Sequence, residues 1–556
     1  MTAETATATN KTISRMAKLL DSVFSFFAAH PLLTLAGLVF LCTVFTVDSR
    51  ALWFSDEVRH GNAFQHLVEA NNWLVMHMNG LPYHDKPPLY FWSLWVLYQF
   101  FGEITPSLFF TAAALWGYAF LCSTYLLARK VGGLNEKRSL LACLLLLATP
   151  FFQMIIHYAR MDLMFATFVC LTYTTFYVAL QQDGPNKYTI LGFFFAGIAV
   201  LTKGQFGPSL PILTVAVYLF WTGQPMRMFK WDVILGGILL VGMIMAWLGG
   251  AYLVEGPGFI DNIINKQVLG RTFGTWHHKE PFFYYMIAGP LIWLPWTFLL
   301  FTAPVRKALT VSYWKERWAK RREVTGMSYL WMAWFSGFVF FSAVSIKVLI
   351  YVLPLLAPLA IVTASSLHKL DVLQSRRFWG LVPLWALLMV GVFLVGDKAV
   401  QWDIPFEGTY LLAALFALGA YWIWMMRKGT AVQLVTLMLV FTLLYVTPLF
   451  GIMAPSLDPA MSTKAPSLMI KEYREKGYTP MTFKVYSGVY TYYSGKNILE
   501  TYNYPELDAF VLEHPKTIAA MSLNKWKNWK NKPASAKVID THWMVDRKQV
   551  LVLIDE

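Results

Sequence analysis

The charged stretch around which this chain is organised reads LWFSDEVRH over residues 52–60, and it directly follows the first hydrophobic span. Asp56 and Glu57 stand side by side here, although only 14% of all residues are charged. Ionisable groups this close to a membrane are functional candidates by default. A structural interpretation also fits: Ser55 caps a helix that runs to about Asn72, and both acids favour its positive end. The two interpretations are compatible, because a helix N-terminus holds a carboxylate in a fixed place.

The composition excludes a soluble protein. Of 556 residues, 57% are hydrophobic and 17% aromatic, which is typical of a polytopic membrane protein. The cysteines lie inside apolar spans, which indicates buried apolar side chains and no disulfide framework or zinc site. The net charge is +14, but Lys and Arg gather in short loops between spans, where they set membrane orientation, so we expect no nucleic-acid partner. These cysteines are Cys42, Cys122, Cys143 and Cys170.

Apolar runs long enough to cross a bilayer predict an α-helical membrane protein with about thirteen transmembrane helices. Residues 1–31 are predicted as a retained interfacial helix, and the short aromatic run 88–101 as a second helix at the interface. The predicted spans lie near residues 32–48, 107–128, 139–157, 162–180, 187–202, 207–222, 232–252, 282–303, 327–345, 348–366, 379–396, 408–426 and 430–450.

The distribution of Lys and Arg predicts the orientation. With the N-terminus inside, every basic loop falls on the cytoplasmic side, as the positive-inside rule requires. The opposite, extracytoplasmic face then receives loops 49–106 and 253–281 of a transmembrane domain at 32–455. It also receives residues 456–556, whose alternating short strands and helices predict a small α/β domain. The candidate chemistry is therefore extracytoplasmic.

Several carboxylates and cations share this outer face, without a Ser-His-Asp or Cys-His signature. This combination indicates transfer of a group that leaves with a phosphate: cations hold the phosphate, and a carboxylate manages a proton or a developing positive charge. Lys86 fits, because Pro87 and Pro88 restrict the backbone after it, although it could also snorkel from the interface. Asp162 begins a span and is costly there without a partner, and the neighbouring Arg160 offers a purely structural pairing.

Three further polar positions stand at the edges of predicted spans. Lys203 ends a span, where snorkelling and function are equally good explanations. Tyr351 follows Lys347 by one helical turn, so we expect both on one helical face. The adjacent His277 and His278 cannot easily bind one metal together, but one of them could do so with a carboxylate from elsewhere, such as Asp85.

Taken together, these motifs resemble the C-type polyprenol-dependent membrane glycosyltransferases. Within that class the sequence is most similar to the aminoarabinose transferases of lipid A modification and the related protein mannosyltransferases. The motifs that carry the resemblance are Leu52-Trp53, Asp56-Glu57, Arg59, Asp85-Lys86-Pro87, Asp162, Thr202-Lys203-Gly204, His278, Pro281-Phe282-Phe283-Tyr284-Tyr285, Pro295-Trp296 and Lys347 to Pro354.

The resemblance implies an inverting transfer of a sugar from undecaprenyl or another polyprenyl phosphate to a lipid acceptor such as lipid A. It places the enzyme in the bacterial inner membrane, with the active site and the C-terminal domain in the periplasm. Asp56, Glu57 and Asp162 are then the catalytic carboxylates, and Asp85 with His278 takes a zinc-, manganese- or magnesium-like ion. The residues expected to bind substrate are Arg59, Lys86, Lys203, Arg271, Lys347 and Tyr351.

The sequence departs from the family pattern at two positions. His60 stands where a tyrosine is usual, which leaves the sugar open, and Asp85 stands where a glutamate is usual, which weakens the metal assignment because Asp is one methylene shorter. Two alternatives remain. A transferase of the same fold could glycosylate protein, which needs a base to deprotonate a Ser or Thr hydroxyl. A transporter or flippase for an anionic lipid would place its charged groups near mid-membrane on broken helices.

Overall fold

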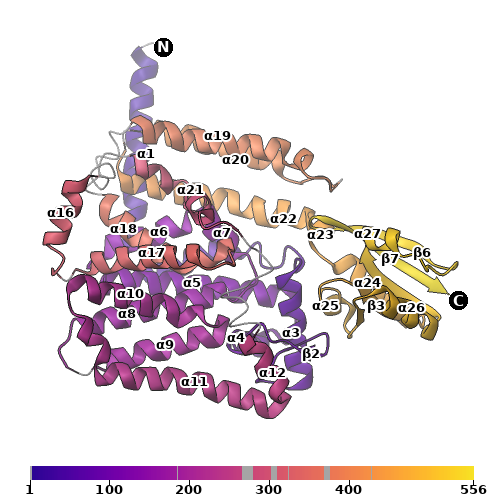
Figure 1. The fold of residues 1–556 in the computed structure, drawn as a ribbon. Helices are drawn as coiled ribbons and strands as arrows, with labels where there is room; N and C mark the ends of the chain where they lie inside the picture. The colour runs from indigo at the N-terminus through magenta and orange to yellow at the C-terminus, as the bar shows by residue number, and fades with distance from the viewer. Residues whose placement is uncertain are drawn as a thin grey trace.

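The computed structural model describes residues 3–184, 186–265, 280–301, 310–323, 325–367, 376–402, 404–427 and 429–555. Figure 1 shows a bundle of helices lying roughly side by side and a smaller α/β unit that projects beyond one end of the bundle. The bundle confirms the predicted class, a polytopic helical membrane protein. Its longer helices are α1 (Ala3–Ala29), α2 (Pro31–Thr43), α5 (Pro106–Lys130), α6 (Glu136–Leu147), α8 (Asp162–Leu180), α9 (Lys187–Lys203), α10 (Phe206–Thr222), α11 (Trp231–Glu255), α17 (Gly326–Ala343), α18 (Leu353–Leu367), α19 (Arg376–Ala399), α20 (Thr409–Met425) and α21 (Ala431–Pro448).

Shorter elements connect these helices, and several of them lie where the bundle meets the α/β unit. They are α3 (Asp56–Ala70), β1 (His77–Met78), β2 (Leu81–Pro82), α4 (Leu89–Phe101), α7 (Pro150–Ile156), η1 (Pro225–Phe229), α12 (Pro257–Asn262), α14 (Tyr284–Ile292), η3 (Trp296–Phe301), α16 (Val311–Ala319), η4 (Leu349–Val352), η6 (Leu449–Met453), α22 (Ala454–Ser456) and α23 (Asp458–Met461).

Helix α8 lies at the centre of the bundle and α11 at its edge. Both are strongly apolar, with mean hydropathies of 1.7 and 2.2, but 72% of the apolar window of α8 is buried against 11% for α11. Helix α8 packs on α5, α9, α10 and α18, whereas α11 packs mainly on α9. An apolar helix that is little buried suits contact with lipid.

Glycines let the central helices approach closely. A Cβ placed on Gly192 of α9 would lie 2.4 Å from the ring of Phe176 on α8. A Cβ on Gly236 of α11 would lie 2.2 Å from the ring of Phe193 on α9. Small residues at helix contacts are the usual means of close packing inside membranes.

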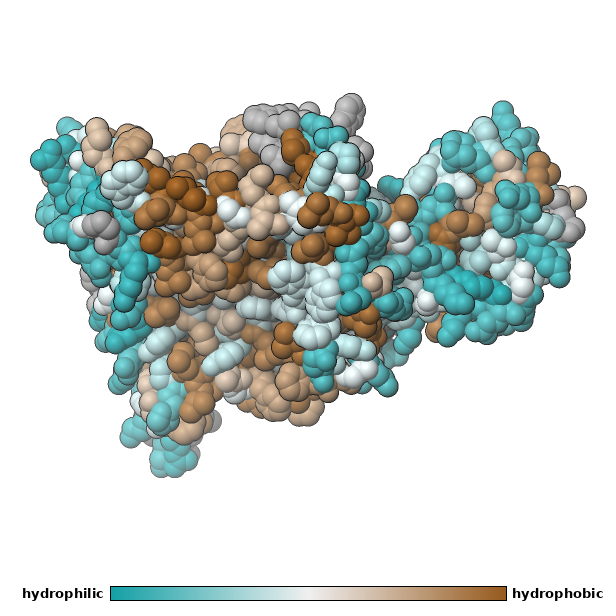
Figure 2. Space-filling view, turned by 90° about the horizontal axis from the view of Figure 1, so that it is seen from below, coloured by the Kyte–Doolittle hydropathy of each residue, from teal (hydrophilic) through white to brown (hydrophobic). Residues whose placement is uncertain are grey.

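The surface of the bundle is also that of a membrane protein. In Figure 2 a broad hydrophobic area covers the bundle, while the α/β unit at the right is mostly hydrophilic. By length and composition, five of the described helices can cross a membrane, or seven if each of two bent pairs counts as one crossing. All thirteen predicted spans contain helix. The number of crossings remains a prediction.

The N-terminal helix changes direction where the first predicted span begins. The axes of residues 11–29 and of α2 differ by 113° across the break at His30. The predicted separate N-terminal helix at 1–31 remains a prediction. Its position in the membrane interface, like that of α4, remains a prediction.

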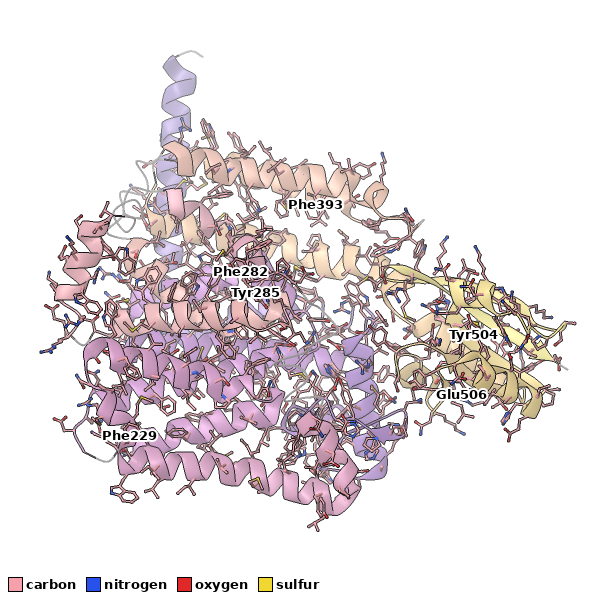
Figure 3. All side chains as sticks on the ribbon, viewed as in Figure 1. Phe229, Phe282, Tyr285, Phe393, Tyr504 and Glu506 are labelled. Atoms are coloured by element: carbon pink, nitrogen blue, oxygen red, sulfur yellow. The ribbon has the colours of Figure 1, made fainter. Side chains whose placement is uncertain are left out.

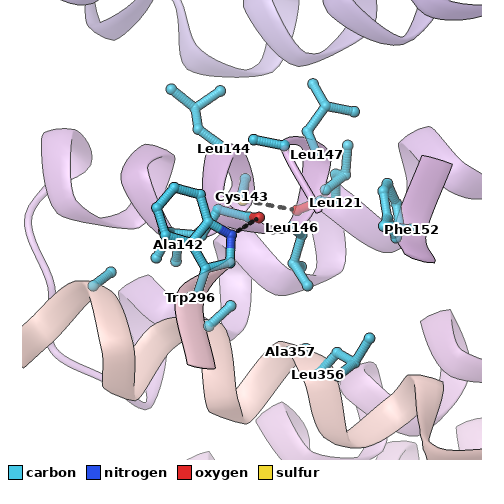
Figure 4. Close-up of a cluster of buried hydrophobic side chains, with 14 of the residues drawn as sticks. Leu121, Ala142, Cys143, Leu144, Leu146, Leu147, Phe152, Trp296, Leu356 and Ala357 are labelled. Carbon is cyan, nitrogen blue, oxygen red and sulfur yellow. Dashed lines mark hydrogen bonds between the residues drawn. The ribbon is translucent and has the colours of Figure 1, made fainter. Parts of the chain in front are cut away.

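One part of the core shows how polar atoms are satisfied inside the bundle (Figure 4). The indole nitrogen of Trp296 donates a hydrogen bond to the Leu145 carbonyl at 2.9 Å, and the Cys143 thiol donates to the Leu121 carbonyl at 3.3 Å. Cys42, Cys143 and Cys170 are buried, and all four cysteines are free. The prediction that the cysteines are buried apolar side chains is confirmed for these three.

The C-terminal α/β unit is built on a five-stranded sheet with the order β4-β3-β5-β7-β6. Strand β3 runs parallel to β4 and β5, and β7 runs antiparallel to β5 and β6. The predicted alternation of short strands and helices is present in this region, and the side of the membrane on which the unit lies remains a prediction. The elements are α24 (Lys464–Glu475), β3 (Thr479–Phe483), α25 (Thr491–Ser494), β4 (Leu499–Thr501), α26 (Tyr504–Glu513), β5 (Lys516–Ser522), α27 (Leu523–Asn528), β6 (Lys537–Met544) and β7 (Arg547–Asp555).

Candidate active site

The first turn of α3 holds the two adjacent acids, as the sequence predicts. Ser55 occupies the N-cap position, but its side chain makes no capping hydrogen bond, and Asp56 and Glu57 follow in the first turn. The helix ends at Ala70, and Asn71 stops it with a left-handed backbone at φ 55°. The turn is therefore fixed by contacts of its acids with other parts of the chain.

Asp56 is surrounded by cations. Its Oδ2 atom lies 2.7 Å from a guanidinium nitrogen of Arg160, and its Oδ1 atom lies 3.8 Å from Arg59. About a quarter of the Asp56 side chain, 26%, remains exposed, whereas Arg160 and Arg59 expose 10% and 15%. A carboxylate in this position is oriented by its partners and still accessible.

The ionised form of the Asp56 carboxyl is strongly favoured over the protonated form. Burial alone would raise the pKa of its carboxyl, but Arg160 acts in the opposite direction, and Lys86 and Arg59 add to its effect. The net result is a pKa well below the usual value of 3.8. Asp56 is therefore an anion at every physiological pH, and Lys86 is close enough to influence it.

A second carboxylate, Asp162, forms an ion pair with Arg160. Asp162 is almost fully buried at the start of α8, with one oxygen 3.0 Å from the Arg160 Nε atom and the other paired with the ammonium of Lys203. Lys203 ends α9, and its ammonium also lies 4.4 Å from the centre of the Tyr351 ring. The structural pair between Arg160 and Asp162 is present, but Arg160 also reaches Asp56, so the pair belongs to the site.

Glu57 points the other way and is buried. Each of its oxygens accepts one hydrogen bond from Arg50, at 2.7 and 2.8 Å, and one from the backbone, namely Trp53 N–H and Ala159 N–H, both at 2.8 Å. Only 1% of Glu57 is exposed. These bonds tie the first turn of α3 to the loop that carries Arg160.

The remaining loop residues lie beside the Asp56 cluster. The Arg59 guanidinium stacks over the Tyr83 ring at 5.4 Å. Burial would lower the pKa of Arg59, but Tyr83, Asp56 and Asp85 raise it above its usual value. Arg59, Asp85 and Lys86 thus share one electrostatic environment with Asp56. The metal-binding role of Asp85 remains a prediction.

The expectation that Lys347 and Tyr351 share a helical face is wrong. Residues 344–348 are not helical, and η4 begins only at Leu349. Lys347 donates to the Val344 carbonyl at 2.7 Å, whereas Tyr351 lies over Lys203. Helical spacing failed because the chain leaves α17 and starts a new element between the two residues.

Arg271 and His278 lie outside the described residues, so their predicted roles remain predictions. Within the described ranges, no group of three or more His, Cys, Asp or Glu side chains could hold a metal ion. The predicted pair, Asp85 with His278, would supply only two ligands, and one of these is not described.

The structure adds site residues that the sequence did not single out. Asp458 accepts a hydrogen bond from the Trp53 indole at 2.7 Å and another from the Ala51 N–H at 2.9 Å. The Tyr493 hydroxyl accepts one from the Leu52 N–H at 2.7 Å. Because these partners are some four hundred residues apart in sequence, no local pattern could have revealed them. The α/β unit thus holds the backbone just before Asp56.

His60 and Tyr90 form an unusual buried pair beneath the site. Their rings meet edge to face at 6.1 Å, and each residue is at most 1% exposed. Neither ring nitrogen of His60 nor the Tyr90 hydroxyl has a hydrogen-bond partner among the described residues. Burial lowers the pKa of His60 to about 3, so the ring is neutral.

An apolar recess is lined by residues that stand near two of the cations in the sequence. It has a volume of about 330 Å³ and lies between α4, α9 and α11, with Trp92 and Trp247 among its walls. Pro88 and Leu201 also line it, two residues from Lys86 and Lys203 respectively. An apolar recess of this kind suits the hydrocarbon chain of a lipid, and the cations suit a negatively charged head group.

The fold of this chain is shared with a solved membrane protein. The crystal structure of ArnT from Cupriavidus metallidurans in the apo state matches with a TM-score of 0.72 at 18% identity, covering 96% of this chain and 98% of that chain. The structure of the same protein bound to undecaprenyl phosphate matches with a TM-score of 0.71, covering 93% and 96%. At this identity the match establishes the fold.

Sequence relatives agree with the fold. The chain is 27% identical over 381 residues to the undecaprenyl phosphate-alpha-4-amino-4-deoxy-L-arabinose arabinosyl transferase 2 of Pseudomonas fluorescens (strain Pf0-1), covering 67% of this chain and 66% of the relative. It is 28% identical to the transferase of that type from Aeromonas hydrophila, covering 67% and 68%. The match spans about two thirds of each relative's length. Residues 85–248 match the dolichyl-phosphate-mannose-protein mannosyltransferase family. The predicted resemblance is confirmed.

Proposed function

We propose that this protein transfers a sugar from a polyprenyl phosphate to a lipid acceptor such as lipid A. The observation that carries the proposal is Asp56, an ionised and partly exposed carboxylate that Arg160 holds beside further cations. The apolar recess is a second feature that suits a lipid donor. The relatives are arabinosyl transferases that are named for undecaprenyl phosphate-linked aminoarabinose, which favours this molecule as the donor.

Donor binding follows from the two neighbouring environments. Arg59 and Lys86 are cations whose charges act on Asp56, and we assign them to the donor phosphate, while Arg160 and Lys203 hold Asp56 and Asp162. The isoprenoid chain then lies along the apolar recess next to Pro88 and Trp92. Fixed cations in a partly desolvated site bind phosphate more strongly than exposed ones.

The transfer step breaks the bond between sugar C1 and the phosphate oxygen, and the phosphate leaves with the electron pair. An oxygen of the acceptor attacks C1 from the opposite side, which inverts the configuration. Asp56 stabilises the positive charge that develops at the sugar, and the cations stabilise the charge on the leaving phosphate. A phosphate acceptor carries no proton to remove, whereas a hydroxyl acceptor would use Asp56 as its base.

The other acids act through their partners. Asp162 with Lys203 holds the Arg160 side chain against Asp56. Glu57 fixes the backbone on both sides of that contact through Arg50 and Ala159. We therefore assign Asp162 and Glu57 as positioning residues and Asp56 as the catalytic residue.

A divalent ion at Asp85 and His278 remains a proposal that rests on the resemblance. A zinc-, manganese- or magnesium-like ion there would supply positive charge to the donor phosphate. None of the steps above depends on it. Activity that survives strong chelation but is lost in His278→Ala would contradict the metal and leave a loop-fixing role for the histidine.

The proposed location is the bacterial inner membrane, with the site and the α/β unit in the periplasm. The support is the charge pattern, because this orientation places all basic loops in the cytoplasm. A membrane-impermeant thiol reagent should label Asn531→Cys in whole cells with a permeable outer membrane and should not label Lys137→Cys. Reversed labelling would overturn the location.

The function is tested with purified protein, undecaprenyl phosphate-linked aminoarabinose and lipid A. Mass spectrometry of the lipid should show the added sugar mass with wild type and not with Asp56→Asn. Donor consumption without a lipid A product would contradict the acceptor. Failure of the wild type to consume any polyprenyl phosphate sugar would contradict the reaction class.

A protein O-glycosyltransferase is the second candidate, because residues 85–248 match the protein mannosyltransferase family. Supplying a Ser- and Thr-containing peptide together with lipid A in one reaction separates the two. Exclusive labelling of the peptide would favour this candidate. A lipid transporter is less well supported, since Asp56, Asp162 and Lys203 gather at helix ends on one side of the bundle.

A further inference from the structure

A second pocket lies at the opposite end of the bundle from Asp56. It has a volume of about 110 Å³ and is formed by the last turn of α8, the first turns of α9 and α11, the middle of α10, and η1. Its wall residues on α8, Phe176 to Leu180, lie 14 to 18 residues after Asp162, which is roughly 21–27 Å along the helix at 1.5 Å per residue. This pocket is therefore no part of the donor site.

The wall of the pocket is apolar on the side that faces the bundle. Phe176, Phe193, Val215 and Leu219 contribute to it. Ile212, also in the wall, is 38% exposed, so the pocket adjoins the surface of the bundle. The volume is several times the ~30 Å³ that one water occupies, which is room for part of a lipid and not for a whole one.

Charged groups of both signs also line the pocket. Arg227 and Lys230 contribute cations, and Arg227 is anchored by a 2.6 Å hydrogen bond to the Leu180 carbonyl and by a 3.2 Å contact with the exposed Asp183. Basic pockets between transmembrane helices on the cytoplasmic side bind the phosphates of lipid head groups.

Asp232 is the unexpected member of the lining. It is only 4% exposed, and its Oδ2 atom accepts hydrogen bonds from the Asn186 N–H at 3.1 Å and the Thr189 hydroxyl at 2.6 Å. Its Oδ1 atom is buried and has no hydrogen-bond partner among the described residues. An unpartnered buried carboxylate oxygen is costly, so a ligand that donates a hydrogen bond to it is favoured.

Large apolar side chains surround this part of the surface. Met226, Phe229 and Trp231 are 79%, 73% and 72% exposed. In Figure 3 Phe229 lies at the end of the bundle remote from Tyr504 and Glu506 of the α/β unit. Exposed aromatic residues at the end of a transmembrane bundle suit the level of lipid head groups.

We propose that this pocket binds a phospholipid with an ethanolamine head group. Its phosphate contacts Arg227 and Lys230, and its ammonium donates to the free oxygen of Asp232. The acyl chains continue along the apolar surface of α10 and α11. The cations and the carboxylate together select a zwitterionic head group whose ammonium has N–H donors. Phosphatidylcholine has a cationic head group without N–H donors, and phosphatidylglycerol has no cationic group.

The test measures lipid retention by native mass spectrometry of the full-length protein in detergent. Equal amounts of phosphatidylethanolamine, phosphatidylcholine and phosphatidylglycerol with matched acyl chains are added. Wild type should retain phosphatidylethanolamine roughly tenfold over phosphatidylcholine, as expected for one charge-assisted hydrogen bond. Equal retention of these two lipids, or stronger retention of phosphatidylglycerol, would overturn the proposal.

Two variants and a control locate the effect. Asp232→Asn keeps one acceptor oxygen for Asn186 and Thr189 but removes the charge, so the preference for ethanolamine should fall to near unity. Lys230→Ala should weaken retention of all three phospholipids. Lys320→Ala is the matched control, because Lys320 is an exposed cation just after α16 and pairs with Glu316. An unchanged preference in Asp232→Asn would overturn the assignment, whatever the transfer activity of the protein.

Discussion

The two adjacent carboxylates in the first turn of α3, Glu57 and Asp56, lie in opposite kinds of environment. On the closed side, Glu57 is buried and both its oxygens are saturated by Arg50 and two backbone N–H groups. On the open side, Asp56 is held by Arg160 but remains accessible. Two acids that are adjacent in the sequence can therefore have different roles. A saturated carboxylate fixes the structure, and an oriented, accessible one can meet substrate.

Breaking the closed side should have the largest effect. Glu57→Gln leaves Arg50 buried without its partner, and removing one member of a buried ion pair costs about 3–5 kcal/mol. We expect a clearly lower temperature of unfolding in detergent, measured by tryptophan fluorescence. Glu103→Gln, at an exposed position before α5, is the control and should unfold like wild type. An unchanged unfolding temperature in Glu57→Gln would remove the distinction between the two sides.

Breaking the open side should abolish activity and spare the fold. Asp56→Asn keeps the shape but removes the charge, and we expect kcat to fall about 10²–10³-fold, as for loss of a preorganised electrostatic group. Its cost in helix stability should stay below about 1 kcal/mol. Asp48→Asn is the control, since Asp48 is exposed and only accepts a bond from Ser107. Loss of merely a few percent of activity would rule out a catalytic role.

A third test changes the contact between Trp53 and Asp458, which lies outside the first turn of α3. Asp458→Asn and Trp53→Phe each weaken the contact between α23 and the segment before Asp56, and a typical hydrogen bond contributes about 1 kcal/mol. We expect kcat to fall severalfold while the KM for the donor stays unchanged. Because both changes affect the bond between Trp53 and Asp458, the double variant should lose less than the product of the two losses. Fully multiplicative losses would mean that Trp53 and Asp458 act independently.

The smallest effect concerns pH. The folded-state pKa of Asp56 lies below 3.8, so the stabilisation from its ion pairs is complete above about pH 5 and is lost only as the pH falls through the folded-state value. The pH–rate profile of wild type should therefore show no acid limb from Asp56 above pH 5. Arg160→Gln removes the strongest opposing charge, and burial should then move such a limb upward. A profile that is identical in Arg160→Gln would contradict the role of Arg160.

Much of this comparison could be anticipated from local sequence. The helix after Ser55, the acids in its first turn, the apolar spans and the strands of the α/β unit follow from periodicity and charge, and the structure has them. The pairing of Arg160 with Asp162 also followed from adjacency. These features depend on residues close together in the chain.

The features that separate Glu57 from Asp56 could not be anticipated. Arg50, Ala159 and Asp458 come from different segments, and only the folded chain brings them together around the turn. Lys347 and Tyr351 show the opposite error, because a regular spacing suggested contact where the backbone changes element. Sequence patterns predict helices and strands well, but they do not predict which distant segments come into contact.

The grip of Asp458 on Trp53 and Ala51 also has a consequence for biosynthesis. The ribosome makes the first turn of α3 early, whereas the residues that hold the preceding backbone emerge only after the last long apolar helix, α21. A nascent chain can therefore insert its helices and carry Asp56 long before that backbone is held in place. The backbone before Asp56 is fully held only when the last segment of the chain has folded, so an incomplete chain has Asp56 without this support.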